Sequence, residues 1–175
     1  MEDLKGMLKK ATRIALNLDP KPDGVDADKV REGWSSVDVP GWDSNQDITF
    51  LTIDISDEPI SQSRDTQAKG SIGNQVKLKT EYTVVILARW VVYGPSSMNN
   101  ALLIRDGLFR PDIKQIMNEQ GAYLVIDPSM PRHAPELFNA KWWDRWDFSA
   151  KFNYKMVREQ DWPYIVSGPV IIKTG

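Results

Sequence analysis

Two carboxylates among tryptophans form the pattern in this chain that most suggests chemistry. Asp144 and Asp147 lie in the segment WWDRWD, which also holds Trp142, Trp143 and Trp146. Enzymes that cleave glycosidic bonds use two carboxyl groups, one to protonate the leaving oxygen and one to attack or to activate water. If the alternation of the residues that follow extends back, however, Asp144 and Asp147 point to opposite faces of a strand. This favours an aromatic core and interface, with a non-catalytic carbohydrate-binding surface as the alternative.

Other residue types that support catalysis are scarce. His133 is the only histidine and there is no cysteine, so sites built on several histidines or on thiolates are unavailable. No G-x-S-x-G elbow is present, and the glycines at 70 and 73 lack the Lys-Ser/Thr of a phosphate loop. His133, among prolines, is interpreted as a surface loop residue. The sequence therefore predicts no enzyme, no cofactor and no metal site.

Composition limits the class of protein further. The 175 residues carry a net charge of −2 and 41% hydrophobic residues, which indicates one globular domain spanning 1–175. A slightly acidic chain is a poor candidate for gripping nucleic acid through its phosphates. No apolar run approaches eighteen residues and the N-terminus has no apolar signal core, so neither a membrane span nor a secretory signal is expected.

The carboxylates lead directly into the most regular element of the sequence. From Trp146 to Met156 every second residue is apolar and the intervening residues are polar. This period of two predicts a long antiparallel strand with one face on a core and one face in water. A long strand with lysines on its wet face suits a scaffold or an assembly surface better than a catalytic pocket.

Two earlier strands and a polar loop complete the predicted sheet. Ile48–Ile55 and Val76–Tyr93 both alternate, and the later half of the second has apolar residues on both faces. The segment from Asp57 to Gln75 contains hardly a large apolar residue and is long for a compact domain, and such loops are usually functional or disordered. We interpret it as a hairpin whose polar tip projects from the body.

Charged residues on this hairpin are candidates for contacts with another subunit. Basic and acidic side chains intermix there, which favours salt bridges across an interface over a phosphate site. Together with the paired tryptophans before the long strand, they form the predicted subunit or partner interface. These residues are Arg64, Asp65, Lys69, Lys77, Lys79, Trp142 and Trp143.

Helices are predicted at the start and in the middle of the chain. Apolar residues at spacings of three and four indicate an amphipathic helix over about 3–18, packed on the domain, with Arg13 among the basic residues opposite. A second helix begins near Met98, and a third spans Asp112–Gln120 after Pro111. The sum is an α+β fold: an antiparallel sheet with helices packed on one face.

The remaining segments are predicted to be connections and short strands. Residues 20–47 read as irregular chain in which Trp34 and Trp42 are pinned onto the core. Tyr123–Ile126 reads as a short buried strand, and Tyr164–Lys173 as a last strand interrupted at Gly168-Pro169.

Two segments carry motifs that are more specific than composition or periodicity. In RWVVYGPSSMNNALLIRDGLF (Arg89–Phe109) a strand ends at Tyr-Gly-Pro and a helix follows. In MPRHAPELFNAKWWDRWDFSAKFN (Met130–Asn153) a Pro-Glu-Leu-Phe motif leads through the Trp-Trp pair into the long strand. In these motifs and in their order the chain resembles the neck or tail-terminator proteins of tailed bacteriophages, which complete the tail and join it to the head. The motifs themselves comprise 45 of the 175 residues. The stretches Pro20–Trp42 and Glu58–Gln75 add nothing to the resemblance.

The resemblance implies a structural role in the virion. Such proteins are small α+β domains that assemble as a ring, usually of six copies, at the end of the tail tube. The implied partners are other copies of the chain, the tail tube protein and the head-completion or connector protein, with DNA passing through the lumen without specific binding. The implied location is the virion neck, after assembly in the host cytoplasm. A virion-borne carbohydrate- or receptor-binding module is the alternative.

Overall fold

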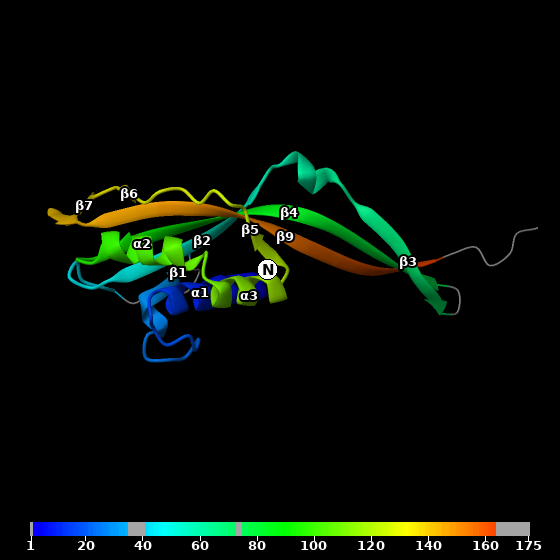
Figure 1. Ribbon diagram of the computed structural model, residues 1–175, viewed down its shortest axis with the longest axis horizontal. Coiled ribbons are helices and arrows are strands. Elements are labelled where there is room, and N and C mark those ends of the chain that lie inside the picture. Colours follow the sequence, from blue (N-terminus) through cyan, green and yellow to red (C-terminus); the bar gives the residue numbers. More distant parts are fainter. Residues whose placement is uncertain (1, 35–40, 73–74, 164–175) are drawn as a thin grey trace, which may run out of the picture.

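The computed structural model describes residues 2–34, 41–72 and 75–163, and it has an elongated α+β architecture (Figure 1). The helices are α1 (Glu2–Ala15), α2 (Ser97–Gly107) and α3 (Pro111–Glu119), with short 3-10 turns η1 (Ala27–Lys29) and η2 (Pro59–Gln62). The strands are β1 (Val30–Glu32), β2 (Ile48–Ser56), β3 (Asp65–Ile72), β4 (Gln75–Tyr93), β5 (Ala122–Leu124), β6 (Arg132–His133), β7 (Glu136–Phe138), β8 (Lys141–Trp143) and β9 (Arg145–Pro163). The predicted α+β class, with helices against one face of a long-stranded antiparallel sheet, is confirmed.

The main sheet is organised around two strands of 19 residues each, β4 and β9. They pair antiparallel without a register shift, from Gln75 opposite Pro163 to Tyr93 opposite Arg145. β2 and then β3 flank β4 on one side, while β5 and β6 lie along the far side of β9. β7 and β8 form a separate two-stranded ribbon.

The core lies between the three helices and one face of this sheet. Side chains at even positions of β4 and β9 point to the helices, and Trp90, Phe148 and Phe152 are all buried there. The Trp90 and Phe148 rings stack with centroids 4.8 Å apart. The Trp90 indole N–H donates a 2.9 Å hydrogen bond to Thr12 Oγ1 of α1, so its one polar atom is satisfied inside the core.

Helix α1 packs on the domain as predicted, but it ends at Ala15, earlier than expected. Asn17 adopts a positive φ of 55° and the Leu18 N–H bonds back to the Arg13 carbonyl, a helix-ending turn that precedes the proline-containing segment. The expectation that Arg13 lies on the wet side is wrong, because the residue is only 3% exposed. The chain folds back after the helix, and the Ala27 carbonyl accepts a hydrogen bond from Arg13 Nη2.

The segment after α1, expected to be irregular, contains η1 and also β1, which pairs parallel with β2, and its two tryptophans differ in exposure. Trp34 is 96% exposed, so the prediction that it is pinned onto the core is wrong. Trp42 does pack, against Phe50 and Tyr93, on the sheet face opposite the helices. The sequence around Trp34 offers no alternation that could distinguish these two outcomes.

The far half of the sheet differs most from the prediction. The strict alternation of β9 stops at Met156, but the strand runs on to Trp162-Pro163, the dipeptide expected to break it, because β4 pairs with it along its whole length. The segment from Asp57 to Gln75 is not simply a loop, since β3 lies within it and pairs with β4. The predicted projecting hairpin is therefore present, built of strands almost to its tip (Figure 1).

Several smaller elements agree with the predictions. α2 and α3 lie where expected, and the predicted strand at Tyr123–Ile126 is observed as β5, Ala122–Leu124. The expectation that this segment is buried is wrong, since Tyr123 is 51% and Ile126 87% exposed. The predicted last strand, Tyr164–Lys173, lies outside the described residues. In the described ranges no helix is long and apolar enough to cross a membrane.

Candidate assembly surfaces

A three-stranded arm projects from the body and forms the first candidate surface. It consists of Arg64 and β3 together with residues 75–82 of β4 and 155–163 of β9. Figure 1 shows it extending well beyond the three helices, and all side chains from Val157 to Pro163 are exposed. A small domain does not need such an extension to complete its own core, so the arm is a natural place for contacts with other molecules.

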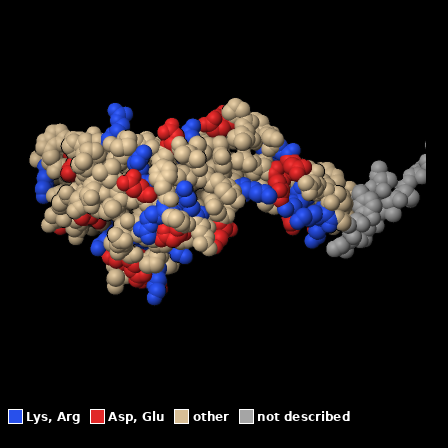
Figure 2. Space-filling model, in the orientation of Figure 1, with Lys and Arg blue, Asp and Glu red and all other residues tan. Residues whose placement is uncertain are grey.

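One face of the arm carries a set of ion pairs. Glu81 pairs with Lys79 and, at 2.7 Å, with Lys155. These two hydrogen bonds, first from Lys155 and then from Lys79, lower the pKa of the Glu81 carboxyl to about 2. Figure 2 shows charged side chains of both signs standing side by side on the arm. Lys69 on the same face lies 4.0 Å from Glu159, so several charges of both signs on this face have partners within the chain.

The opposite face of the arm continues the face that carries the helices in the body. Tyr82 lies there under two guanidinium groups, with Arg64 Cζ 4.0 Å and Arg158 Cζ 5.9 Å from its ring centroid, a cation–π arrangement. Val76 and Trp162 lie opposite each other farther out, and Trp162 is 52% exposed. None of the residues named on this face is acidic, whereas the first face carries Glu81. One face of the arm is therefore aromatic and basic, and the other holds ion pairs.

The predicted interface residues on the hairpin all lie on this arm. Arg64 covers Tyr82, Lys79 pairs with Glu81, and Lys69 Nζ lies 4.0 Å from a Glu159 carboxylate oxygen. Asp65 accepts a hydrogen bond from Gln67. Lys77 is exposed. The structure thus brings these residues together on the arm, along β3 and β4, and gives several of them partners within the chain.

The second candidate surface is an aromatic cluster at the other end of the molecule. Trp143 packs edge-on against Trp42, with ring centroids 5.8 Å apart, and against Tyr93 at 6.4 Å. A cleft of about 500 Å³ opens beside them. The indole nitrogens of Trp42 and Trp143 are buried without a hydrogen-bond partner among the described residues. Trp142, the other predicted interface tryptophan, is instead 66% exposed on the β7–β8 ribbon.

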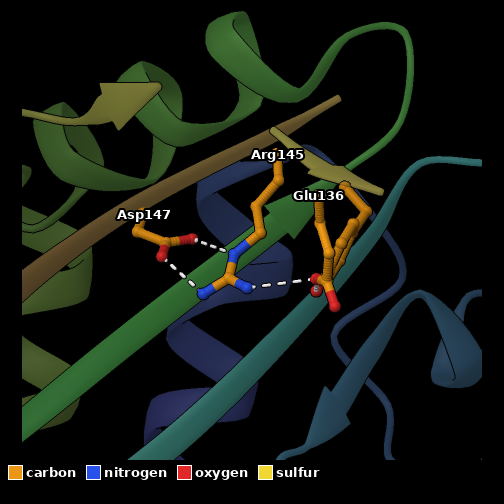
Figure 3. Close-up of polar contacts among 4 residues, drawn as sticks. Glu136, Arg145 and Asp147 are labelled. Atoms are coloured by element: carbon orange, nitrogen blue, oxygen red, sulfur yellow. Dashed lines mark hydrogen bonds and ion pairs between the residues drawn. The ribbon is translucent and has the colours of Figure 1, made fainter. Parts of the chain in front are cut away.

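Arg145, the first residue of β9, makes the polar contacts beside this cluster (Figure 3). Its guanidinium makes two hydrogen bonds to Asp147, of 2.8 and 2.6 Å, and one of 3.1 Å to Glu136. Glu136 in turn accepts the Tyr93 hydroxyl at 2.7 Å. Burial, and then the hydrogen bond to Glu136, raises the pKa of Tyr93 to about 12. The pKa of Arg145 is raised, chiefly by its hydrogen bonds to Asp147.

The carboxylates first considered for catalysis have separate partners. Asp147 is held by Arg145, whereas Asp144 bonds to His133 Nε2 at 2.7 Å. His133 is exposed as predicted, although it belongs to the short strand β6 and stacks on Trp146. Among the described residues no group of three or more His, Cys, Asp or Glu side chains could hold a metal ion.

Sequence reasoning missed the polar residues of the aromatic end, Tyr93, Glu136 and Arg145. They lie far apart in the sequence and meet only because β4 and β9 pair in register and the β7 segment returns beside them. The available signal was the charge of Arg145 and Asp147 two positions apart on one strand face. Nothing in the sequence pattern indicated Glu136.

Comparison with known proteins was consistent with a structural role. A search of curated proteins found no match. A family model described as phage neck terminator protein matches residues 2–174. Because that match covers almost the whole chain, the protein belongs to the phage neck terminator family.

Proposed function

We propose that this protein forms a ring, of six copies as the family resemblance implies, at the junction between phage head and tail. There it ends the tail tube and joins it to the head-side connector. The observation that carries this proposal is the match of the neck terminator family over residues 2–174. The protein is accordingly a virion component that assembles in the host cytoplasm.

The elongated shape supports ring formation. The arm and the aromatic end lie at opposite ends of the molecule and differ in chemistry (Figure 1). A ring closes through heterologous contacts, in which one patch of a subunit meets a different patch of the next. Two unlike surfaces at opposite ends meet that requirement.

The charge distribution supports free passage of DNA. The net charge of the chain is −2, and on the arm Lys79 and Lys155 both pair with Glu81. A lumen lined with uncompensated lysine and arginine would bind DNA through many phosphate contacts. Paired charges leave the genome free to slide. In keeping with the structural role of the family, the protein is proposed to act by shape and contact and not as an enzyme.

Free subunits are proposed to stay apart until the tube is complete. An assembly that ends a tube must not form without it. Weak contacts between subunits become effective when the tube's end holds several copies side by side, because the local concentration of partners then rises.

Electron microscopy of necks tests the proposal directly. The expected result is a closed ring between tube and connector, with few lysine and arginine side chains turned towards the DNA. A single copy, an open spiral or a basic lumen that holds DNA would overturn it. Tryptophan fluorescence during titration with soluble sugars tests the alternative binding module, which requires saturable quenching.

A further inference from the structure

The outer edge of β9 in the arm is an unpaired sheet edge. β5 pairs with β9 only at Phe152–Tyr154, and no described strand lies beside the seven residues from Val157 to Pro163. At roughly 3.3 Å per residue this edge is about 23 Å long. Proteins usually shield such edges, because exposed backbone donors and acceptors invite another strand.

The direction of the backbone groups on this edge follows from hydrogen bonds in the body. The Lys155 N–H donates to the Gly121 carbonyl at 3.0 Å, and the Lys151 carbonyl accepts from the Val125 N–H at 2.9 Å. Antiparallel strands alternate the side to which successive residues bond. Since β9 has no register shift, the N–H and C=O groups of Val157, Glu159 and Asp161 point to the free edge.

Pro163 fits the same alternation. It stands at an odd position at the end of β9, opposite Gln75. A proline lacks an N–H and is tolerated in a sheet where that group would face away from the neighbouring strand. Its missing donor therefore falls on the outer edge, and the free edge offers backbone donors only as far as Asp161.

On the other side of the arm β3 forms a second edge, beside which no strand of the described ranges lies. Asp65–Ala68 pair regularly with β4, and a register shift follows near Gly70, whose φ is 101°. β3 and β9 both run antiparallel to β4 and therefore run parallel to each other. The arm thus carries two free edges that face in opposite directions.

We propose that the outer edge of β9 pairs with β3 of a second copy of this chain, so that the sheet continues from arm to arm. Copies related by rotation about an axis along the arm would bring these edges together in parallel. The net charges of the two edges are opposite in sign: residues 157–163 hold Arg158, Glu159 and Asp161, one excess negative charge, and residues 64–72 hold Arg64, Asp65 and Lys69, one excess positive charge. The inference rests on the proposed ring and names the contact that closes it.

A proline substitution tests the role of the backbone edge. Glu159→Pro removes an N–H that faces outward and spares the pairing of β9 with β4, whereas Glu159→Ala loses the same carboxylate and keeps the N–H. We expect both variants to unfold at closely similar denaturant concentrations, and only the proline variant to lose incorporation into virions by tenfold or more. Equal incorporation of the two folded variants would overturn the proposal.

Engineered cysteines test which strands meet, since the natural chain has none. Gln67 and Glu159 both lie level with Lys79. Within one copy they are two strand spacings, roughly 10 Å, apart, too far for a disulfide. Oxidised virions of the variant that carries both Gln67→Cys and Glu159→Cys should therefore yield a ladder of covalent oligomers. Either single variant should yield at most dimers, and Glu159→Cys combined with Gln115→Cys on α3 should yield no ladder.

The outcomes separate this inference from the proposed function. Shifting the first cysteine to Asp65 or Lys69 allows for a stagger between copies along the arm. Closed rings in micrographs, without a ladder from any of these three pairs, would overturn the strand pairing and leave the ring in place. Absence of a ring would overturn both.

Discussion

The body and the arm are built from the same two strands, yet they differ in what covers them. Trp90 and Trp162 lie on the same face of the sheet, on neighbouring strands. In the body α1 packs over that face and Trp90 is 0% exposed, whereas Trp162 in the arm is 52% exposed. The same uninterrupted pairing of β4 with β9 thus forms part of the core in the body and an exposed surface in the arm.

The comparison shows that strand length and stability are separate properties in this protein. Hydrophobic stabilisation scales with the apolar area removed from water, and that area is concentrated where helices meet the sheet. The arm retains its backbone pairing and ion pairs but buries little apolar surface within one chain. Its surface is therefore free for contacts with other chains.

The largest expected effect comes from truncating the buried tryptophan. Trp90→Ala should lower the free energy of unfolding by about 3–5 kcal/mol, because it removes a fully buried ring and leaves a cavity. Trp162→Ala should lower it by less than about 1 kcal/mol. Denaturant titration of the two purified variants measures both values. Comparable losses would mean that the arm contributes as much to the core as the body does.

The hydrogen bond inside the core should give the next largest effect. Thr12→Val removes the acceptor of the Trp90 indole N–H with little change of shape, and it should cost about 1–3 kcal/mol because a buried donor is left unpaired. Thr12→Ser keeps the hydroxyl and should retain more of that free energy. The same denaturant titration measures the difference, and Thr12→Val as stable as the parent would contradict this account of the core.

Shortening the arm should affect assembly far more than stability. Replacing Gln62–Gly73 by a short Gly-Ser turn removes β3 and should leave a folded body, with a loss of about 1 kcal/mol or less, because little buried apolar surface is lost. Virions made with this variant should contain filled heads and unjoined tails, as counted by electron microscopy. Normal necks at parental yield would remove β3 from the mechanism.

The smallest expected effect is a pH dependence within the arm. A carboxyl whose folded pKa is depressed contributes stability that is present above its ordinary value near 4.5 and is lost as the pH falls towards 2. An NMR titration should place the pKa of Glu81 near 2, and Lys155→Met should raise it by removing the largest cause of the shift. Glu81→Gln should flatten the acid limb of stability slightly, while a Glu81 pKa near 4.5 would contradict the ion pairs.

Much of the fold could be predicted because it follows from local periodicity. The alternation from Trp146 to Met156 and along β4 identified the two central strands, and the spacing of apolar residues identified the three helices. The predictions that failed concern long-range contacts. Trp34 was expected to be buried and is exposed, whereas Arg13 was expected to be exposed and is buried. Burial depends on which segment folds back over a side chain, and periodicity carries no such information.

The candidate surfaces were likewise predicted only in part from the sequence. The sequence indicated a charged projecting hairpin and singled out its Arg64, Asp65, Lys69, Lys77 and Lys79, but it assigned β3 to a loop. Polar residues such as Thr66 and Gln67 pair in β3 only because β4 supplies a long neighbouring edge. Strand propensity depends on that kind of context more than helix propensity does.

By itself, then, the sequence determined the fold class, the two long strands and the absence of thiol chemistry, since these depend on composition and local pattern. Only the tertiary structure decided where the covered part of the sheet ends and the arm begins. It also decided which residues meet at the aromatic end and which backbone edges stay open. These features depend on pairing between segments far apart in the chain, and the antiparallel register of β4 with β9 fixes them together.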